Sequence, residues 1–376
     1  MPSDASDSSL TPLALKLRRD IAERGPIPLH DYMEACLYNL QHGYYRTRDP
    51  LGRGGDFITA PEISQVFGEL VGLWAAQVWM QMGQPQSVRL VELGPGRGTL
   101  MADALRAARV MPGFLQSIAV HLVESSEVLR EAQKATLAGV PAPIHWHGDI
   151  GEVPRGPAIV IANEFFDCLP VRQFVFDGAA EVWRERVVAF EDGAFHLATS
   201  SDVAQPPLTA ASYGEPRDGD ISEHCPGVGP LLAKFVARAG DAPLAALIID
   251  YGYAKPAFGE TLQAVRRHRF AELFDAPGET DLTAHVDFSL LARLAENAGF
   301  AVFGPMAMGE WLLRLGVEAR ANQLLASASA EEARAIAQSI ARLVDPAQMG
   351  ALFKILSWTR GISEPPPPFG EHFKGG

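Results

Sequence analysis

Polar and glycine residues gather at the ends of several short apolar runs, and the first of these groups carries the clearest chemical signal. Residues 88–93 (VRLVEL) are too few for a helix and rich in valine and leucine, which predicts a buried parallel strand. Glu92 lies in this run, and three glycines follow before a helix-prone segment over residues 99–109. Such a turn brings bare backbone close to a ligand at the carboxyl edge of a sheet. The three glycines are Gly94, Gly96 and Gly98.

Three interpretations of this glycine turn are open. Glu92 followed by Gly-x-Gly-x-Gly resembles the first motif of class I S-adenosylmethionine-dependent methyltransferases, whose ligand has no pyrophosphate. A dinucleotide-binding fingerprint would need a third glycine where this chain has Thr99. A purely structural glycine turn is the third interpretation.

The next apolar run, residues 118–123, ends at Glu124. A carboxylate at this point of a parallel sheet can accept hydrogen bonds from both ribose hydroxyls of a nucleoside. The alternative is an acid near the start of a helix over residues 125–137, where the helix dipole favours negative charge.

A third predicted strand, residues 144–147, ends near Asp149 and Ile150. Asp149 can accept from an adenine amino group while Ile150 packs on the ring, although Asp149 is also a common turn residue. A fourth, residues 158–162, runs into the loop NEFFDCLP, which starts at Asn163 and holds Glu164 and Asp167. Acids and aromatics directly after a core strand indicate a functional loop.

Composition excludes several classes of protein. The chain has 376 residues, is 47% hydrophobic and has a formal charge of −13, without a basic stripe, so we expect no nucleic-acid binding. No apolar stretch of about 18 residues is present, so we expect no membrane insertion. The three cysteines are isolated, and His145 and His147 have no second ligand pair at zinc spacing, so we expect no metal. The polar first ten residues fit neither a signal nor a transit peptide, so we expect a cytoplasmic protein.

Strands alternate with helices through residue 162, which predicts an α/β fold with a doubly wound, Rossmann-like sheet. We expect a helical N-terminal segment with a lid over residues 1–86, and the first part of the core over 87–172. A β-rich insertion is expected over 173–240, then the second part of the core with a helical insertion over 241–362, and a disordered tail over 363–376.

Particular elements are expected within these segments. Helices are predicted over residues 13–24, 28–40, 61–82 and 288–297, the last with Asp287 as its N-cap. Short strands are expected over 174–176, 182–190, 195–197 and 245–250, and residues 201–230 read as loose turns. Asp56 and Phe57, flanked by glycines, are candidates for a mobile lid over the ligand.

Five ordered motifs together resemble the MidA-like methyltransferases, a family that includes the mitochondrial complex I assembly-factor protein arginine methyltransferase. The motifs are GDFITAPEISQVFG (55–68), ELGPGRGTL (92–100), NEFFD (163–167), DYGY (250–253) and DLTAHVDF (281–288). The resemblance covers residues 13–362. It implies an S-adenosylmethionine-dependent methyltransferase that dimethylates an arginine on a subunit of respiratory NADH dehydrogenase (complex I). Eukaryotic relatives would lie in the mitochondrial matrix, whereas the lack of a transit-peptide pattern here suggests a bacterial cytoplasmic member.

A guanidinium acceptor would need carboxylates that hold its planar fork and offset its charge. Glu164 and Asp167 are the first candidates for this catalytic role, and Asp250, Tyr251 and His285 follow, with His285 a possible proton relay. The cofactor candidates are Glu92, Gly94, Gly96, Gly98, Glu124, Asp149, Ile150 and Asn163. Two rivals stay open, a non-catalytic assembly chaperone that binds S-adenosylmethionine and an NAD-dependent oxidoreductase. The sequence does not indicate an oligomeric state.

Overall fold

The computed structural model describes residues 10–47, 59–206 and 214–370. The chain forms two compact units, and each is built from several separate stretches of sequence. The first unit consists of Met1–Phe57, Asp167–Val228 and Lys255–His285. The second unit consists of Ile58–Phe166, Gly229–Ala254 and Val286–Gly376.

The second unit is built on an eight-stranded sheet in the order β15-β16-β10-β5-β2-β3-β4, with β14 paired to β10. Strands β4, β3, β2, β5 and β10 run parallel, whereas β16 pairs antiparallel with both β10 and β15. The strands are β2 (Val88–Leu93), β3 (Ile118–Val123), β4 (Ile144–His147), β5 (Ala158–Asn163), β10 (Leu244–Tyr253), β14 (Val286–Asp287), β15 (Ala301–Ala307) and β16 (Phe353–Arg360).

The order of these strands creates a switch point between β2 and β5. From β2 the chain moves outward through β3 to β4, and then returns to place β5 on the other side of β2. In open α/β sheets, ligands bind in the crevice outside the carboxyl ends of the strands at such a point. The residues that follow β2 and β5 are therefore the first place to look for a site.

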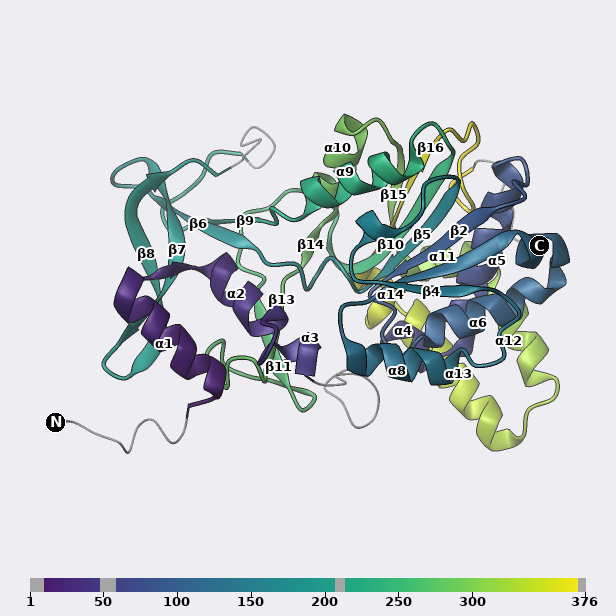
Figure 1. Ribbon diagram of the computed structural model, residues 1–376, viewed down its shortest axis with the longest axis horizontal. Helices are drawn as coiled ribbons and strands as arrows, with labels where there is room; N and C mark the ends of the chain where they lie inside the picture. Colours follow the sequence, from purple (N-terminus) through teal and green to yellow (C-terminus); the bar gives the residue numbers. More distant parts are fainter. Residues whose placement is uncertain (1–9, 48–58, 207–213, 371–376) are drawn as a thin grey trace. The chain divides into compact units, whose positions relative to one another are not determined.

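Helices cover both faces of this sheet (Figure 1). One face carries α9 (Val228–Ala239) and α10 (Phe288–Asn297), and Phe235 of α9 packs on Trp358 of β16. The helices on the other face and at the sheet edges are α4 (Ala60–Ile63), α5 (Gln65–Gln81), α6 (Thr99–Ala107), α7 (Pro112–Ser117), α8 (Glu127–Thr136), α11 (Met308–Arg314), α12 (Val317–Leu325), α13 (Ala330–Val344) and α14 (Met349–Leu352).

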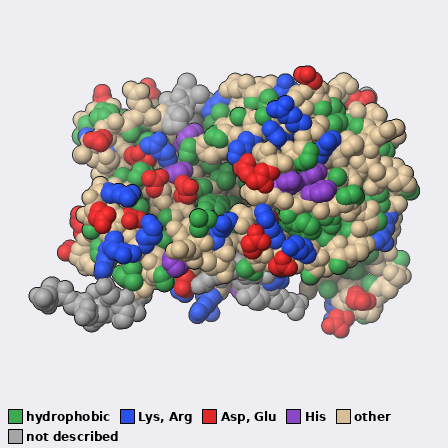
Figure 2. Space-filling model, viewed as in Figure 1, with side chains coloured by type: hydrophobic (Ala, Val, Ile, Leu, Met, Phe, Trp, Pro, Cys, Tyr) green, Lys and Arg blue, Asp and Glu red, His purple; other side chains and the backbone are tan. Residues whose placement is uncertain are grey.

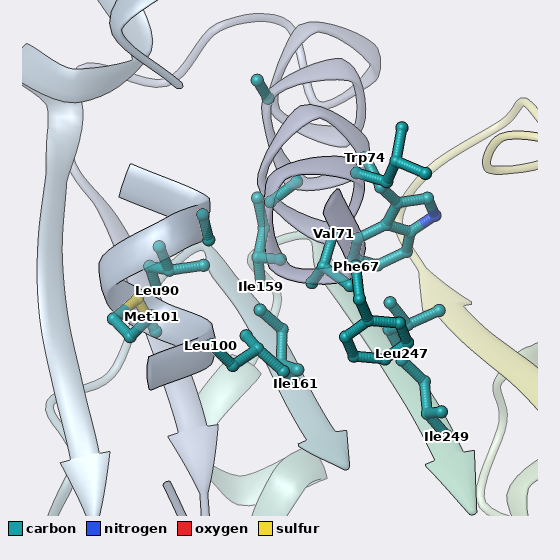
Figure 3. Close-up of a cluster of buried hydrophobic side chains, with 14 of the residues drawn as sticks. Phe67, Val71, Trp74, Leu90, Leu100, Met101, Ile159, Ile161, Leu247 and Ile249 are labelled. Atoms are coloured by element: carbon teal, nitrogen blue, oxygen red, sulfur yellow. The ribbon is translucent and has the colours of Figure 1, made fainter. Parts of the chain in front are cut away.

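The main core lies between α5, α6 and the central strands (Figure 3). Phe67 and Trp74 of α5 pack there on strand residues that alternate along β5 and β10, such as Ile161 and Leu247. Gly72 is required at the crossing of the two helices, because a Cβ there would lie 2.3 Å from the Ala104 carbonyl oxygen of α6. This close contact fixes α6, and the glycine turn that precedes it, against α5.

The first unit combines helices with two small antiparallel sheets. One sheet has the order β1-β7-β6-β9 with β8 paired to β7, and the other has the order β12-β11-β13. Leu17 of α1 and Met33 of α2 are buried in its own core. The elements are α1 (Pro12–Arg24), β1 (Ile27–Pro28), α2 (Leu29–Tyr38), α3 (Tyr44–Thr47), β6 (Arg172–Asp177), β7 (Val182–Glu191), β8 (Ala194–Ala204), β9 (Ile221–His224), β11 (Gln263–Arg266), β12 (Arg269–Phe270) and β13 (Asp281–Thr283).

The sequence analysis anticipated much of this architecture. The doubly wound sheet is confirmed, β2, β3 and β4 have the predicted bounds, and Asp287 caps α10 by accepting from the Leu290 N–H. The predicted helix over 61–82 is divided at Ser64, which is extended and whose side chain caps α5. The helix α9 and the strand β9 occupy part of the stretch that was expected to be loose.

The structure also divides the chain at other points than the five predicted segments. Residues of the predicted N-terminal segment belong to both units, and 255–285 joins the first unit rather than the core. The expectation of a disordered tail is wrong for residues 363–370, because Pro366 is buried and Phe369 packs against the main core. The run of prolines predicted an extended tail, but its apolar rings pack against the core of the second unit.

Candidate functional site

The glycine turn after β2 needs glycine at each of its three positions. Gly94, Gly96 and Gly98 have φ values of +60°, +53° and +82°, in the left-handed region that other residues rarely adopt. A Cβ on Gly94 would also lie 3.2 Å from the Phe165 ring, and Gly98 is the N-cap of α6. The turn therefore presents backbone rather than side chains at the switch point, as a site for a ligand requires.

Two buried acceptors at this edge have no hydrogen-bond donor among the described residues. Glu92 is 2% exposed and its Oε2 atom has no hydrogen-bond partner among the described residues; Asn163 Oδ1 is in the same situation. Burial raises the pKa of Glu92 from 4.5 to about 8. Because parallel pairing sets Glu92 opposite Ile161, Asn163 lies on the same face of the sheet as Glu92. Buried acceptors of this kind can hold a cationic donor such as the α-ammonium group of S-adenosylmethionine.

Glu124 is preorganised at the end of β3. It is 7% exposed, and its Oε1 accepts from the Ser126 N–H at 2.7 Å, while Oε2 accepts from Gln133 Nε2 at 3.3 Å. Burial raises the pKa of Glu124, an effect that these donors oppose. A carboxylate accepts about four hydrogen bonds, so Glu124 keeps room for a ribose hydroxyl beside the Ser126, Gln133 and Ser125 donors. Ser126, not Glu124, is the N-cap of α8.

Asp149 has partners in the protein for both carboxylate oxygens. Oδ1 accepts from the Gly151 N–H at 2.7 Å, and Oδ2 pairs with Lys234 Nζ of α9 at 2.5 Å. Burial alone would raise the pKa of Asp149, but these two contacts outweigh it and lower the pKa. Asp149 therefore acts here as a turn and ion-pair residue, and the neighbouring Ile150 is buried. A contact of Asp149 with an adenine amino group stays a prediction.

The loop after β5 is held in a strained conformation. Glu164 has φ +50°, which is unfavourable for a residue with a Cβ, and such outliers concentrate at functional sites. Its Oε1 accepts from the Ala60 N–H at the start of α4 (3.2 Å) and from Asn163 Nδ2 (3.3 Å). Fully buried Asp250 accepts from the N–H groups of Phe165 and Phe166 at 3.2 and 2.9 Å. Asp250, a secondary candidate for chemistry, is thus the residue that fixes the loop.

Acids and tyrosines meet in the first unit. Asp167 and Asp281 are 6% and 1% exposed, and the stacked rings of Tyr38 and Tyr45 have centroids 5.9 Å apart. Burial, followed by Asp281, Cys168 and Asp167, raises the pKa of Tyr45 well above 10. The Tyr38 hydroxyl donates to the Cys168 carbonyl at 2.9 Å. We call Tyr38, Tyr45, Asp167 and Asp281 the acid–tyrosine cluster.

The sequence contained little sign of this cluster beyond Asp167. Tyr38 and Tyr45 come from a helical region more than 120 residues earlier, where they read as helix-end residues. Asp281 lies in the DLTAHVDF motif, but nothing in the spacing connected it with Asp167. The Ala284 N–H, which donates to the Asp167 carbonyl at 2.9 Å, is the backbone contact that joins the two segments.

His285 follows β13 in the same unit. Its backbone N–H donates to Thr261 Oγ1 at 2.9 Å, and its Nε2 lies 3.4 Å from Gln263 Nε2. The side chain is half-buried. These contacts orient the residue, and they leave its role as a proton relay as a prediction.

Three histidines lie together on the neighbouring strands β3 and β4. His145 and His147 do share one face of β4, and both stack on His121 of β3. Acidic, basic and histidine side chains are interspersed on the face shown in Figure 2. Asp56 and Phe57, the lid candidates, lie outside the described residues. None of the described helices is long and apolar enough to cross a membrane.

Comparison with known proteins adds to this geometry. The family described as "Putative S-adenosyl-L-methionine-dependent methyltransferase" matches residues 70–306. "Protein arginine methyltransferase NDUFAF7 homolog, mitochondrial" of Drosophila melanogaster is 39% identical, over 96% of this chain and 87% of its own length. The human protein arginine methyltransferase NDUFAF7, mitochondrial, is 36% identical, over 94% of this chain and 85% of its own.

A solved structure covers almost the whole chain. It is that of a COG1565 superfamily member from Burkholderia thailandensis bound to S-adenosyl-homocysteine. The two chains are 30% identical and superpose with a TM-score of 0.81, over 96% of this chain and 95% of the other.

Proposed function

The chain belongs to the family of S-adenosyl-L-methionine-dependent methyltransferases, and from that premise we propose that it methylates an arginine side chain of a protein. The acceptor that we propose is a subunit of respiratory NADH dehydrogenase, whose assembly the methylation would support. The enzyme class and the cofactor follow from family membership. The relatives named as protein arginine methyltransferases support the arginine acceptor, and the acid–tyrosine cluster is the observation that carries it in this chain.

The proposal assigns the cofactor to the edge of the sheet at β2, β3 and β4. Gly94, Gly96 and Gly98 admit the methionine moiety, and Glu92 and Asn163 accept from its ammonium group. Glu124 accepts from the ribose hydroxyls. Asp149 and Ile150 contact the adenine. The orphaned acceptors and the bare glycine backbone support this assignment.

The acceptor arginine requires acids because a guanidinium stays protonated at neutral pH. Asp167 and Asp281 can accept from its planar fork, and the neutral rings of Tyr38 and Tyr45 offer faces to a cation. Glu164 and Asp167 are three residues apart, so the backbone keeps their Cα atoms within about 11 Å of each other. Both follow β5 closely along the chain, and we propose the end of β5 as the point of methyl transfer.

The residues chiefly align the acceptor and offset its charge. The bound cofactor supplies an electrophilic methyl group. Glu164 and Asp167 point one guanidinium nitrogen toward it, and their negative charge favours loss of the proton from that nitrogen as the new bond forms. His285 would accept that proton in the same unit as Asp167. Asp250 contributes indirectly, since it fixes the peptide groups of Phe165 and Phe166.

The test is a single-turnover transfer measurement on Glu164→Gln. This variant keeps the oxygen that accepts from Ala60 N–H but removes the charge. We expect transfer to fall about 100-fold or more, as for other lost electrostatic contacts to a transition state, while S-adenosylmethionine affinity stays within a few-fold. The substrate is the protein labelled by tritiated S-adenosylmethionine in a cell lysate. Glu131→Gln, an exposed acid of α8, is the matched control and should transfer normally.

Two results would contradict the assignment. An equal loss of cofactor binding and of transfer would move Glu164 from the acceptor side to the cofactor. Undetectable transfer by the unaltered protein in the presence of purified complex I subunits would favour a chaperone that binds the cofactor without using it.

A further inference from the structure

Gln133 is a fully buried polar residue in the helix that the sequence predicts over residues 125–137. It lies on α8 with 0% exposure. Burying an amide is costly unless its hydrogen-bonding groups find partners. Gln133 has three, and they come from three different parts of the second unit.

The chemistry of these partners determines the orientation of the amide. The indole N–H of Trp146 on β4 can only donate, so the atom it meets at 2.9 Å must be the amide oxygen, Oε1. The amide nitrogen then faces the other two partners. It donates one N–H to the carbonyl oxygen of Gly96 at 2.7 Å and the other to Glu124 Oε2 at 3.3 Å. Exchanging oxygen and nitrogen would set acceptor against acceptor at Gly96 and Glu124.

The two contacts of the amide nitrogen restrain the orientation of the Gly96 peptide and of the Glu124 carboxylate. The Gly96 peptide lies in a left-handed glycine turn, which has little side-chain packing to hold it. The Glu124 carboxylate is held on one side by Ser126 N–H, and Gln133 supplies the donor on the other. Trp146 anchors the amide from β4, and Lys134 lies 5.9 Å from the centre of its ring.

We propose that Gln133 is a positioning residue for S-adenosylmethionine, which couples the Gly96 turn at the methionine end of the cofactor to the Glu124 carboxylate at the ribose end. The inference rests on the proposed assignment of Gly96 and Glu124 to the cofactor. One amide fixes both groups before the ligand arrives, and preorganisation of this kind reduces the cost of binding. Gln133 itself needs no contact with the ligand.

The test begins with Gln133→Met, which keeps the length and bulk of the side chain but has no amide. We expect its Kd for S-adenosylhomocysteine, measured by calorimetry, to rise at least tenfold. Trp146→Phe removes only the donor that orients the amide, and a smaller rise of about threefold is expected, on the order of 0.6 kcal/mol. Gln81→Met is the matched control, because the Gln81 amide donates to the Pro365 carbonyl away from the site. The affinity of this variant for S-adenosylhomocysteine should be unchanged.

A double-mutant cycle separates positioning from simple loss of stability. If Gln133 acts through Glu124, Glu124→Ala should weaken binding much less in the Gln133→Met background than in the unaltered protein. Additive effects, or a Gln133→Met affinity within twofold of the unaltered protein, would overturn the inference. If Glu124→Ala alone has no effect on affinity, the proposed cofactor site is at fault instead.

A measurement on the unaltered protein covers the possibility that Gln133→Met does not fold. The Trp146 indole N–H should shift in a ¹⁵N-correlated NMR spectrum when S-adenosylhomocysteine binds, because its acceptor belongs to the coupled amide. An unmoved indole resonance at saturation would count against the coupling.

Discussion

Two regions of the second unit each bury a glutamate to the same degree, but the pKa of the two glutamates shifts in opposite directions. Glu69 on α5 and Glu92 on β2 are both 2% exposed. Burial alone would raise the pKa of Glu69, but hydrogen bonds from Arg320 and Arg106 outweigh it and lower the pKa. Among the described residues no arginine donates to Glu92, and burial raises its pKa to about 8.

The surroundings of Glu69 form a closed ion network. Arg320 of α12 donates through Nε and Nη2 at 2.7 and 3.0 Å, and Arg106 of α6 donates at 3.0 Å. Arg106 also pairs with Asp103 at 2.7 Å. The network joins three helices, and every charge in it has a partner inside the protein.

The Glu92 carboxyl has no comparable network among the described residues. Its Oε2 atom has no partner among the described residues, although native proteins rarely leave a buried carboxylate oxygen unsatisfied. The difference between the two regions indicates that satisfied buried charges hold this unit together, whereas an unsatisfied buried acceptor marks where a ligand is expected. Three predictions test this comparison.

The largest effect is expected at the closed network. Glu69→Gln removes the charge that two guanidinium groups share, and we expect the free energy of unfolding to fall by about 3 to 5 kcal/mol, the range for breaking a buried ion pair. Urea unfolding followed by circular dichroism measures it. Glu127→Gln breaks an exposed pair with Arg130 at 3.2 Å and should cost less than about 1 kcal/mol. Similar losses of unfolding free energy in the two variants would show that the Glu69 network stabilises the protein no more than an exposed ion pair does.

At Glu92, the same type of substitution is expected to raise the free energy of unfolding. The folded protein keeps a proton on Glu92 that the unfolded chain loses above pH 4.5, so the unaltered protein should lose stability relative to Glu92→Gln as the pH rises from about 4.5 to about 8. At pH 7 the apo variant should be more stable by about 3 kcal/mol, since each pKa unit corresponds to about 1.4 kcal/mol.

The same variant should bind S-adenosylmethionine more weakly, because the Glu92 carboxyl can give up its proton to offset an ammonium group, whereas a neutral amide cannot. Thermal unfolding across this pH range, with and without the cofactor, measures both effects. A stability difference that does not change with pH would show that Glu92 is already ionised in the folded protein.

The smallest effect is expected at Glu124, whose oxygens are partly satisfied by the protein. Glu124→Ala should weaken S-adenosylhomocysteine binding by about 1 to 3 kcal/mol, the range for a lost hydrogen bond to a charged group. Ser126→Ala removes the cap of α8 and should lower stability by about 1 kcal/mol without changing the affinity. Unchanged affinity in Glu124→Ala would assign this carboxylate to the local structure of the turn.

The cofactor edge was the part of the site most open to prediction. Glu92 lies near the end of β2, and the three glycines and Glu124 directly follow strands. The apolar runs of these strands end at recognisable residues, and the parallel sheet brings such ends together. Gln133 and the acid–tyrosine cluster could not be found in this way. Gln133 sits in a helix at a position that a polar residue commonly occupies, and its burial depends on where β4 and the glycine turn lie.

The sequence by itself determined the local elements of this protein: the strands β2 to β4, the glycine turn, the cap of α10 and the methyltransferase family. Propensity, capping and periodicity act over a few residues and can be read directly. Only the tertiary structure decided the position of β16 between β10 and β15, the division into two units and the partner of Glu69, 251 residues away in Arg320. These choices depend on which distant surfaces bury each other, and no local pattern carries that information.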